Sequence, residues 1–236
     1  MSEKCIQAWI FVRGDSMGLP GKNTLPLCGK PMIAYSIECA QKCRFIKDVF
    51  VSTDSPTVAA TAEQYGAVVP FLRPAELADI MTPVYHSWRH AIEWNRSQNE
   101  FPRMDVMVSL PVSTPLRTCE EVTEAIELYL KGEADTVIAV SKSNRNPAYD
   151  MVFRDGNGMA KLIIPNEDPL ARKRETLAYD ITNVVYVSSC DYIMQESNYL
   201  RGRVGTIEVP REHSLDINDV WDFKLAEIIL NEGGAK

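Results

Sequence analysis

Short apolar runs alternate with amphipathic segments over the first 141 residues of this 236-residue chain. The apolar runs are rich in β-forming residues and stop at polar positions, which predicts buried strands. These strands span residues 7–12, 48–53, 67–72, 105–110 and 136–141. Helical periodicity or a proline in the first turn predicts helices over 31–43, 56–65, 83–94 and 119–131. The alternation predicts an α/β fold: a three-layer, Rossmann-like, mostly parallel sheet covered on both faces.

The pattern changes after residue 141. Residues 142–180 predict irregular chain and a hairpin, because turn residues at 155–158 separate two strand-like runs. Two more strands are expected over 181–188 and 204–209, and an amphipathic helix over 219–230. The chain has no internal repeat and no linker. We therefore predict one domain over residues 1–236, with 142–180 as a hairpin insertion or dimerisation arm.

Composition and charge narrow the class of protein. Hydrophobic residues make up 45% of the chain and charged residues 24%, which suits a sizeable core. A net charge of -7 argues against nucleic acid as a partner. The sequence has no stretch of the roughly 18–20 apolar residues that a membrane helix requires. Without a signal peptide or a CxxC motif, the six cysteines are expected to be reduced thiols in the cytoplasm.

A loop with three glycines, Arg13 to Asn23, follows the first predicted strand and precedes the first long helix. Ligands of open α/β sheets sit at the carboxyl ends of strands, where this loop lies. Arg13 and Lys22 add positive charge that suits phosphate groups. The glycine spacing is neither GxGxxG nor that of a P-loop. A tight surface turn and a phosphate cradle both fit the composition, and the position directly after a strand favours the cradle.

Several motifs in fixed order resemble those of one family. They read IFVRGDSMGLPGKN, VFVSTDS, RPAEL, SLPVSTPLR and REHSLDIND, and they span nearly the whole chain. They resemble the signatures of the acylneuraminate cytidylyltransferases, which couple CMP to sialic acids. The resemblance implies an α/β nucleotide-binding fold, CTP and an acidic sugar as substrates, Mg2+ as cofactor, and a homodimer.

The resemblance also assigns roles to residues of this chain. Those expected on the nucleotide side are Arg13, Ser16, Gly18, Lys22, Asn23 and Arg73. Asp216 and Asn218 are expected to hold the metal, and Arg13, Lys22 and Asp216 to act in catalysis. Those expected on the sugar side are Arg172, Arg174, Tyr179 and Asp180. Without the resemblance, Asp216 reads as part of a helix cap and the 172–174 run as a solvated loop.

Three positions depart from the family pattern. Met17 replaces a lysine of the loop, Pro111 replaces a glutamine, and Asn218 replaces a second aspartate. An asparagine still offers an oxygen, but a neutral one, to a hard cation. The expected reaction is attack of a sugar hydroxyl on the α-phosphorus of CTP with release of pyrophosphate. Two alternatives stay open: another acceptor (an octulosonate or a phosphonate) or another base, and a nucleotide-binding homologue with little turnover.

Overall fold

A computed structural model describes residues 4–16, 18–165 and 178–233. Its centre is a six-stranded sheet in the order β10-β6-β9-β5-β1-β4. The strands are β1 (Ile6–Phe11), β4 (Asp48–Ser52), β5 (Val106–Ser109), β6 (Thr136–Lys142), β9 (Tyr179–Ser189) and β10 (Val204–Glu208). The pairs β1·β4, β1·β5 and β6·β10 are parallel, whereas β9 runs antiparallel between β5 and β6. The mostly parallel sheet is confirmed.

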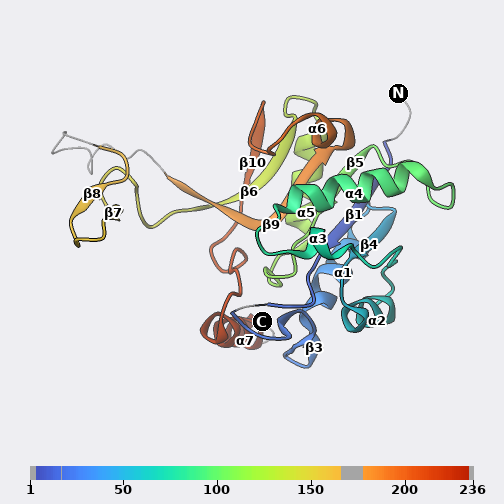
Figure 1. Cartoon of the computed structure of the whole chain (residues 1–236), viewed down its shortest axis with the longest axis horizontal. Coiled ribbons are helices and arrows are strands. Elements are labelled where there is room, and N and C mark those ends of the chain that lie inside the picture. Colours follow the sequence, from blue (N-terminus) through green and yellow to red (C-terminus); the bar gives the residue numbers. More distant parts are fainter. Residues whose placement is uncertain (1–3, 17, 166–177, 234–236) are drawn as a thin grey trace.

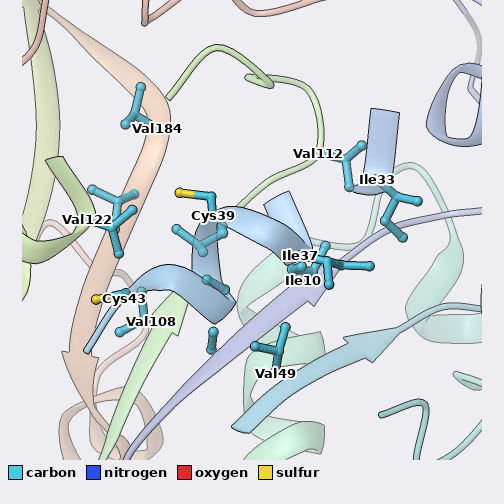
Figure 2. Close-up of a cluster of buried hydrophobic side chains, with 14 of the residues drawn as sticks. Ile10, Ile33, Ile37, Cys39, Cys43, Val49, Val108, Val112, Val122 and Val184 are labelled. Carbon is cyan, nitrogen blue, oxygen red and sulfur yellow. The ribbon is translucent and has the colours of Figure 1, made fainter. Parts of the chain in front are cut away.

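Helices cover both faces of the sheet and make the expected three layers (Figure 1). One face packs against α1 (Met32–Lys42), α2 (Pro56–Gln64), α5 (Cys119–Leu130) and α7 (Val220–Gly233). Figure 2 shows part of this core, where aliphatic side chains of α1 meet those of the strands. The other face is rich in aromatic residues and packs against α4 (Val84–Ser97) and α6 (Cys190–Gln195). None of the helices in the described ranges is long and apolar enough to cross a bilayer.

Local signals explain where some elements begin. Helix α5 starts with a capping box, in which the Thr118 hydroxyl accepts from the Glu121 amide and the Glu121 carboxylate accepts from the Thr118 amide. Five smaller elements were not predicted: the 3-10 helix η1 (Lys22–Thr24), the helices α3 (Ala75–Ala78) and α6, and the short strands β2 (Pro26–Leu27) and β3 (Lys30–Pro31). They are too short to produce a periodic pattern.

The predicted strand over 67–72 is wrong. Only two isolated bridges form there, Phe50 to Val68 and Thr53 to Leu72. The reason is Pro70, which lies in the middle of the segment and has no amide hydrogen to donate to a strand ladder. This edge of the sheet therefore ends at β4.

The predicted hairpin is present. Strands β7 (Val152–Arg154) and β8 (Ala160–Leu162) pair antiparallel and stand away from the sheet (Figure 1). The Asp155 carboxylate closes the turn by accepting from the amides of Asn157 and Met159. We call residues 143–165, which include this hairpin, the arm. Its role in dimerisation stays a prediction.

Candidate active site

The loop of residues 13–23 forms one wall of a cleft at the carboxyl ends of β1 and β5. We call it the loop cleft; its volume is about 400 Å³. Its lining includes Arg13, Ser16, Gly18, Lys22, Asn23 and Asn218. The structure thus brings together five of the six residues expected on the nucleotide side. It adds Asn218 from REHSLDIND, residues 211–219, which we call the closing motif.

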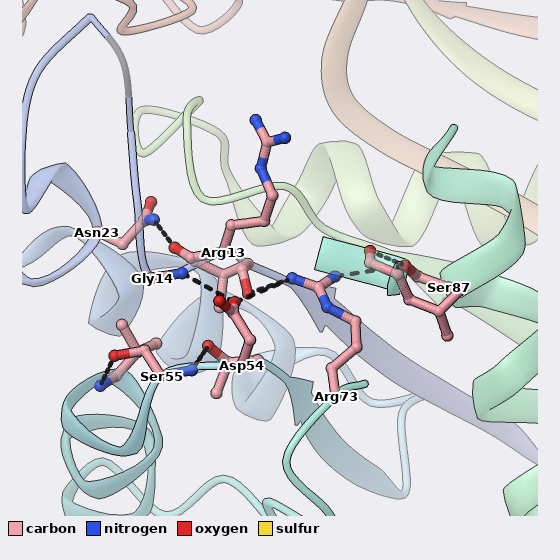
Figure 3. A network of polar contacts seen from close by, with 11 residues as sticks. Arg13, Gly14, Asn23, Asp54, Ser55, Arg73 and Ser87 are labelled. Carbon is pink, nitrogen blue, oxygen red and sulfur yellow. Dashed lines mark hydrogen bonds and ion pairs between the residues drawn. The ribbon is translucent and has the colours of Figure 1, made fainter. Parts of the chain in front are cut away.

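Hydrogen bonds hold both ends of this loop. The Asn23 side chain donates to the carbonyl of Arg13 over 2.7 Å, and the Gly14 amide donates to Asp54 over 3.0 Å (Figure 3). Gly21 has φ of 68°, a left-handed conformation that glycine adopts without strain. The guanidinium of Arg13 points away from Asp54 (Figure 3) and lines the cleft. The Arg13 guanidinium, which forms no ion pair with any of the described residues, therefore faces this hollow.

Arg73 lies behind the loop rather than in the loop cleft. Its side chain is buried, donates to the carbonyl of Val12 over 2.7 Å and lies 3.6 Å from the Asp54 carboxylate (Figure 3). Burial lowers the pKa of Arg73, and Asp54 opposes this shift. In this structure Arg73 supports the start of the loop. The family motif signalled an arginine at this place but not the direction in which it points.

Gly18 brings the loop against the closing motif. A Cβ added at Gly18 would lie 2.0 Å from the carbonyl oxygen of Asn218. The Lys22 ammonium donates to the carbonyl of Ile217 over 2.7 Å. Residues near opposite ends of the chain are therefore in direct backbone contact, which sequence reasoning did not predict.

The Lys22 ammonium is partly buried and is influenced by charged groups of both signs. Burial lowers the pKa of its ammonium, Asp216 and Asp222 oppose the shift, and Arg13 adds to it. A lysine desolvated in this way is a strong point charge for an anion that enters the loop cleft.

Asn218 lines the loop cleft, and Asp216 lines a second hollow. The side-chain nitrogens of Asn218 and Asn183 both donate to Asp216 Oδ2, over 3.1 and 3.2 Å. Asp216 Oδ1 is buried and has no hydrogen-bond partner within the described part of the chain. A buried carboxylate oxygen without a partner fits a divalent cation, because Mg2+ sites often use one or two carboxylates and complete their shell with water and phosphate. No group of three or more His, Cys, Asp or Glu residues in the described ranges offers a full protein cage for a metal.

The second hollow, which we call the arm cleft, opens at the base of the arm and has a volume of about 420 Å³. Its polar lining includes Lys142, Arg145, Asp180, Asn183, Arg211 and Asp216. Three cations from two segments, Lys142 and Arg145 at the end of β6 and Arg211 after β10, thus face the same hollow. An anionic ligand next to Asp216 would find its charge matched there.

The structure places the residues expected on the sugar side in different positions. Asp180 lines the arm cleft. Tyr179 is exposed and does not line it, and a hydrogen bond with Glu208 raises its pKa. Arg172 and Arg174 lie outside the described residues, as does Met17.

Two functional candidates were missed from sequence. Nothing in the sequence marks Asn183, because its contact with Asp216 depends on the path of β9. Arg117 is fully buried, where it donates to the carbonyl of Val184 over 2.7 Å and to the carbonyl of Pro111. Pro111 thus contributes its backbone carbonyl as a hydrogen-bond acceptor for Arg117. Neither residue carried a spacing signal, because both act on segments far away in the chain.

A cationic glycine loop at the carboxyl edge of this sheet is the arrangement of a nucleotide-binding α/β protein. Residues 8–141 match the family model described as Cytidylyltransferase. The chain therefore belongs to the cytidylyltransferase family and is a nucleotidyltransferase.

Individual relatives agree with this assignment. The CMP-N,N'-diacetyllegionaminic acid synthase of Campylobacter jejuni is 29% identical over 223 residues, covering 94% of this chain and 93% of that protein. The N-acylneuraminate cytidylyltransferase of Escherichia coli is 30% identical over 224 residues, covering 94% of this chain and 51% of that protein. A solved structure of CMP:2-keto-3-deoxy-manno-octonic acid synthetase complexed with CTP shares the fold, with a TM-score of 0.69 at 16% identity over 98% of this chain and 100% of that one.

Proposed function

We propose that this protein transfers CMP from CTP to an acidic keto-sugar of the nonulosonate type and releases pyrophosphate. The observation that carries the proposal is that two neighbouring residues of the closing motif line two cationic clefts, Asp216 the arm cleft and Asn218 the loop cleft. The family match supports CTP as the donor. The names of the relatives, which act on legionaminic and acylneuraminic acids, support the acceptor.

The triphosphate is assigned to the loop cleft. Arg13 offers a planar fork and Lys22 a point charge, and both line this cleft. Ser16 and the loop amides add donors that need no reorganisation when charge develops on the phosphate. Asn23 contributes by holding the carbonyl of Arg13. Catalysis on this side is positioning and charge neutralisation, as in other phosphoryl transfers.

The sugar is assigned to the arm cleft. Its carboxylate would be matched by Lys142, Arg145 or Arg211, which line this cleft. Asp180 lies in the same cleft, where its carboxylate would accept hydrogen bonds from the sugar hydroxyls. Contacts from Arg172, Arg174 and Tyr179 remain part of the proposal.

Asp216 and Asn218 would hold Mg2+, Asp216 through its unpartnered Oδ1. When bound, the cation supplies charge neutralisation at the reacting phosphate. The chain itself keeps the Asp216 carboxylate in place at the arm cleft through the amides of Asn183 and Asn218.

The arm is proposed to join two copies of the chain. It exposes large apolar side chains, among them Phe153 at 66% and Met159 at 69%. Exposed apolar side chains gathered on one segment are typical of protein–protein contacts. The mass of the protein in sedimentation equilibrium tests the homodimer.

Pyrophosphate release tests the function, measured with each of the four nucleoside triphosphates, with and without Mg2+, against a panel of acidic keto-sugars. We expect release with CTP and a nonulosonate only when Mg2+ is present. Asp216→Asn should lower kcat/KM by more than about 100-fold, since even loss of an outer-shell partner of a metal costs about 10–100-fold.

Asp219→Asn is the matched control. Asp219 is exposed and caps α7 by accepting from the Trp221 and Asp222 amides, which an asparagine side chain can also do. Its activity should stay within about twofold of wild type, because surface substitutions of this kind change little. Nucleotide binding without pyrophosphate release for any pair would instead identify a binding homologue.

A further inference from the structure

The two oxygens of the Asp216 carboxylate are not equivalent. Oδ2 accepts two amide hydrogen bonds, from Asn183 and Asn218, whereas Oδ1 is buried and unpartnered in the described part of the chain. A carboxylate held by two donors on one oxygen cannot turn without breaking both bonds. The oxygen that faces a ligand is therefore selected by the two amides.

The orientation of the Asn183 amide is itself set by Tyr186. The Tyr186 hydroxyl lies 2.9 Å from Asn183 Oδ1 and must donate to it, so the NH2 group faces Asp216. Tyr186 is buried, with its ring 5.8 Å from Trp88 and 5.1 Å from Tyr199. Burial raises the pKa of Tyr186, so its hydroxyl keeps the proton that it donates.

The path of β9 explains why Asn183 reaches this place. Between the pairs Ile138–Tyr186 and Val140–Ile181, β6 advances two residues while β9 advances five. Irregularities of this kind re-aim a side chain and are common beside active sites. The carbonyl of Asn183 is also held, by the Thr114 hydroxyl at 2.6 Å and by Arg117 at 3.2 Å. Both the backbone and the side chain of Asn183 are thus fixed.

We propose that Asn183 is a positioning residue that presents Asp216 Oδ1 to the divalent cation, with Tyr186 fixing the Asn183 amide. This inference rests on the proposed function, which places the cation at Asp216. Asn183 does not touch the substrate in this role; it acts through the carboxylate. Asn218 donates to the same oxygen, which an aspartate at this position could not do.

The test is a titration of the whole protein with Mn2+ alone, followed by the electron paramagnetic resonance signal of free Mn2+. Asn183→Leu removes the amide at similar volume, and Tyr186→Phe removes only the hydroxyl. Tyr85→Phe is the matched control, because the buried Tyr85 hydroxyl has no partner among the described residues and its ring packs on the same Trp88.

We expect Asn183→Leu to weaken Mn2+ binding by about 10–100-fold, as loss of an outer-shell partner does, and Tyr186→Phe to weaken it less. Tyr85→Phe and the affinity for CTP measured without metal should not change. The Mg2+ concentration for half-maximal pyrophosphate release should rise by the same factor. If the wild-type protein releases no pyrophosphate but its Mn2+ affinity still depends on Asn183, this inference is supported and the proposed function is refuted. Wild-type Mn2+ affinity in Asn183→Leu, or no Mn2+ binding by the wild-type protein, overturns the inference.

Discussion

Substitution of Gly18 by alanine perturbs the contact between the loop and the closing motif with a single methyl group. The added Cβ would lie 2.0 Å from the carbonyl oxygen of Asn218 and 3.2 Å from its carbonyl carbon. Both are backbone atoms, so no side chain can rotate away to make room. Gly18→Ala therefore forces the loop and the 216–218 segment apart.

The size of the movement follows from the contact distance. Real Cβ atoms essentially never approach a heavy atom closer than 3.0 Å, so the two segments must separate by at least 1 Å, the difference from 2.0 Å. A displacement of about 1 Å costs an enzyme on the order of 100-fold in rate. Overpacking of this kind also lowers the free energy of unfolding by about 1–3 kcal/mol.

Two measurements check this prediction: kcat/KM for pyrophosphate release, and urea denaturation followed by circular dichroism. Gly156→Ala is the control, because an added Cβ there meets nothing within 4 Å and its backbone is not left-handed. The control should behave as wild type in both assays. A Gly18→Ala protein with wild-type kcat/KM and wild-type stability would refute the argument that these backbones touch.

Two further predictions concern the buried Arg117 and the half-buried Lys22. Arg117→Met should lower the free energy of unfolding by about 3–5 kcal/mol, because it removes the hydrogen bonds that this buried guanidinium donates to the carbonyls of Val184, Pro111 and Asn183. Arg44→Met, at an exposed pair with Glu127, should cost less than about 1 kcal/mol, and urea denaturation of the two variants compares them. Because the pKa of Lys22 lies below its ordinary 10.5, its charge is lost as pH rises through that lowered value, and activity that depends on the ammonium should fall there. Lys22→Arg does not titrate in that range, so its activity should persist to higher pH, and coincident pH profiles would contradict this assignment.

Much of the fold could be predicted from sequence because its signals are local. The strand before the glycine loop, the capping box at Thr118 and the turn at Asp155 each depend on neighbouring residues. The prediction of a strand over 67–72 was wrong because it gave more weight to the apolar run than to Pro70, the one residue there that cannot donate to a ladder. The antiparallel direction of β9 was not predicted, since a strand sequence carries no information on its direction in a sheet.

The candidate site was predictable only in part. Arg13 and Lys22 follow from loop composition, and Asp216 from the family motif. The contact of Asn183 with Asp216 requires the irregular path of β9, and the burial of Arg73 requires the packing of Ser87 and Val12 around it. These are tertiary contacts between distant segments, which no periodicity in the sequence reports.

The position of β9 in the sheet also affects how the protein folds during translation. Synthesis runs from the N-terminus, and domains tend to fold in that order. Until residues 179–189 leave the ribosome, β5 and β6 each lack the neighbour that separates them, so the sheet consists of β4-β1-β5 and an unattached β6. Unpaired strand edges template aggregation. Chains that stop short of β9 should therefore accumulate as aggregates, and the growing chain needs protection at this stage of translation.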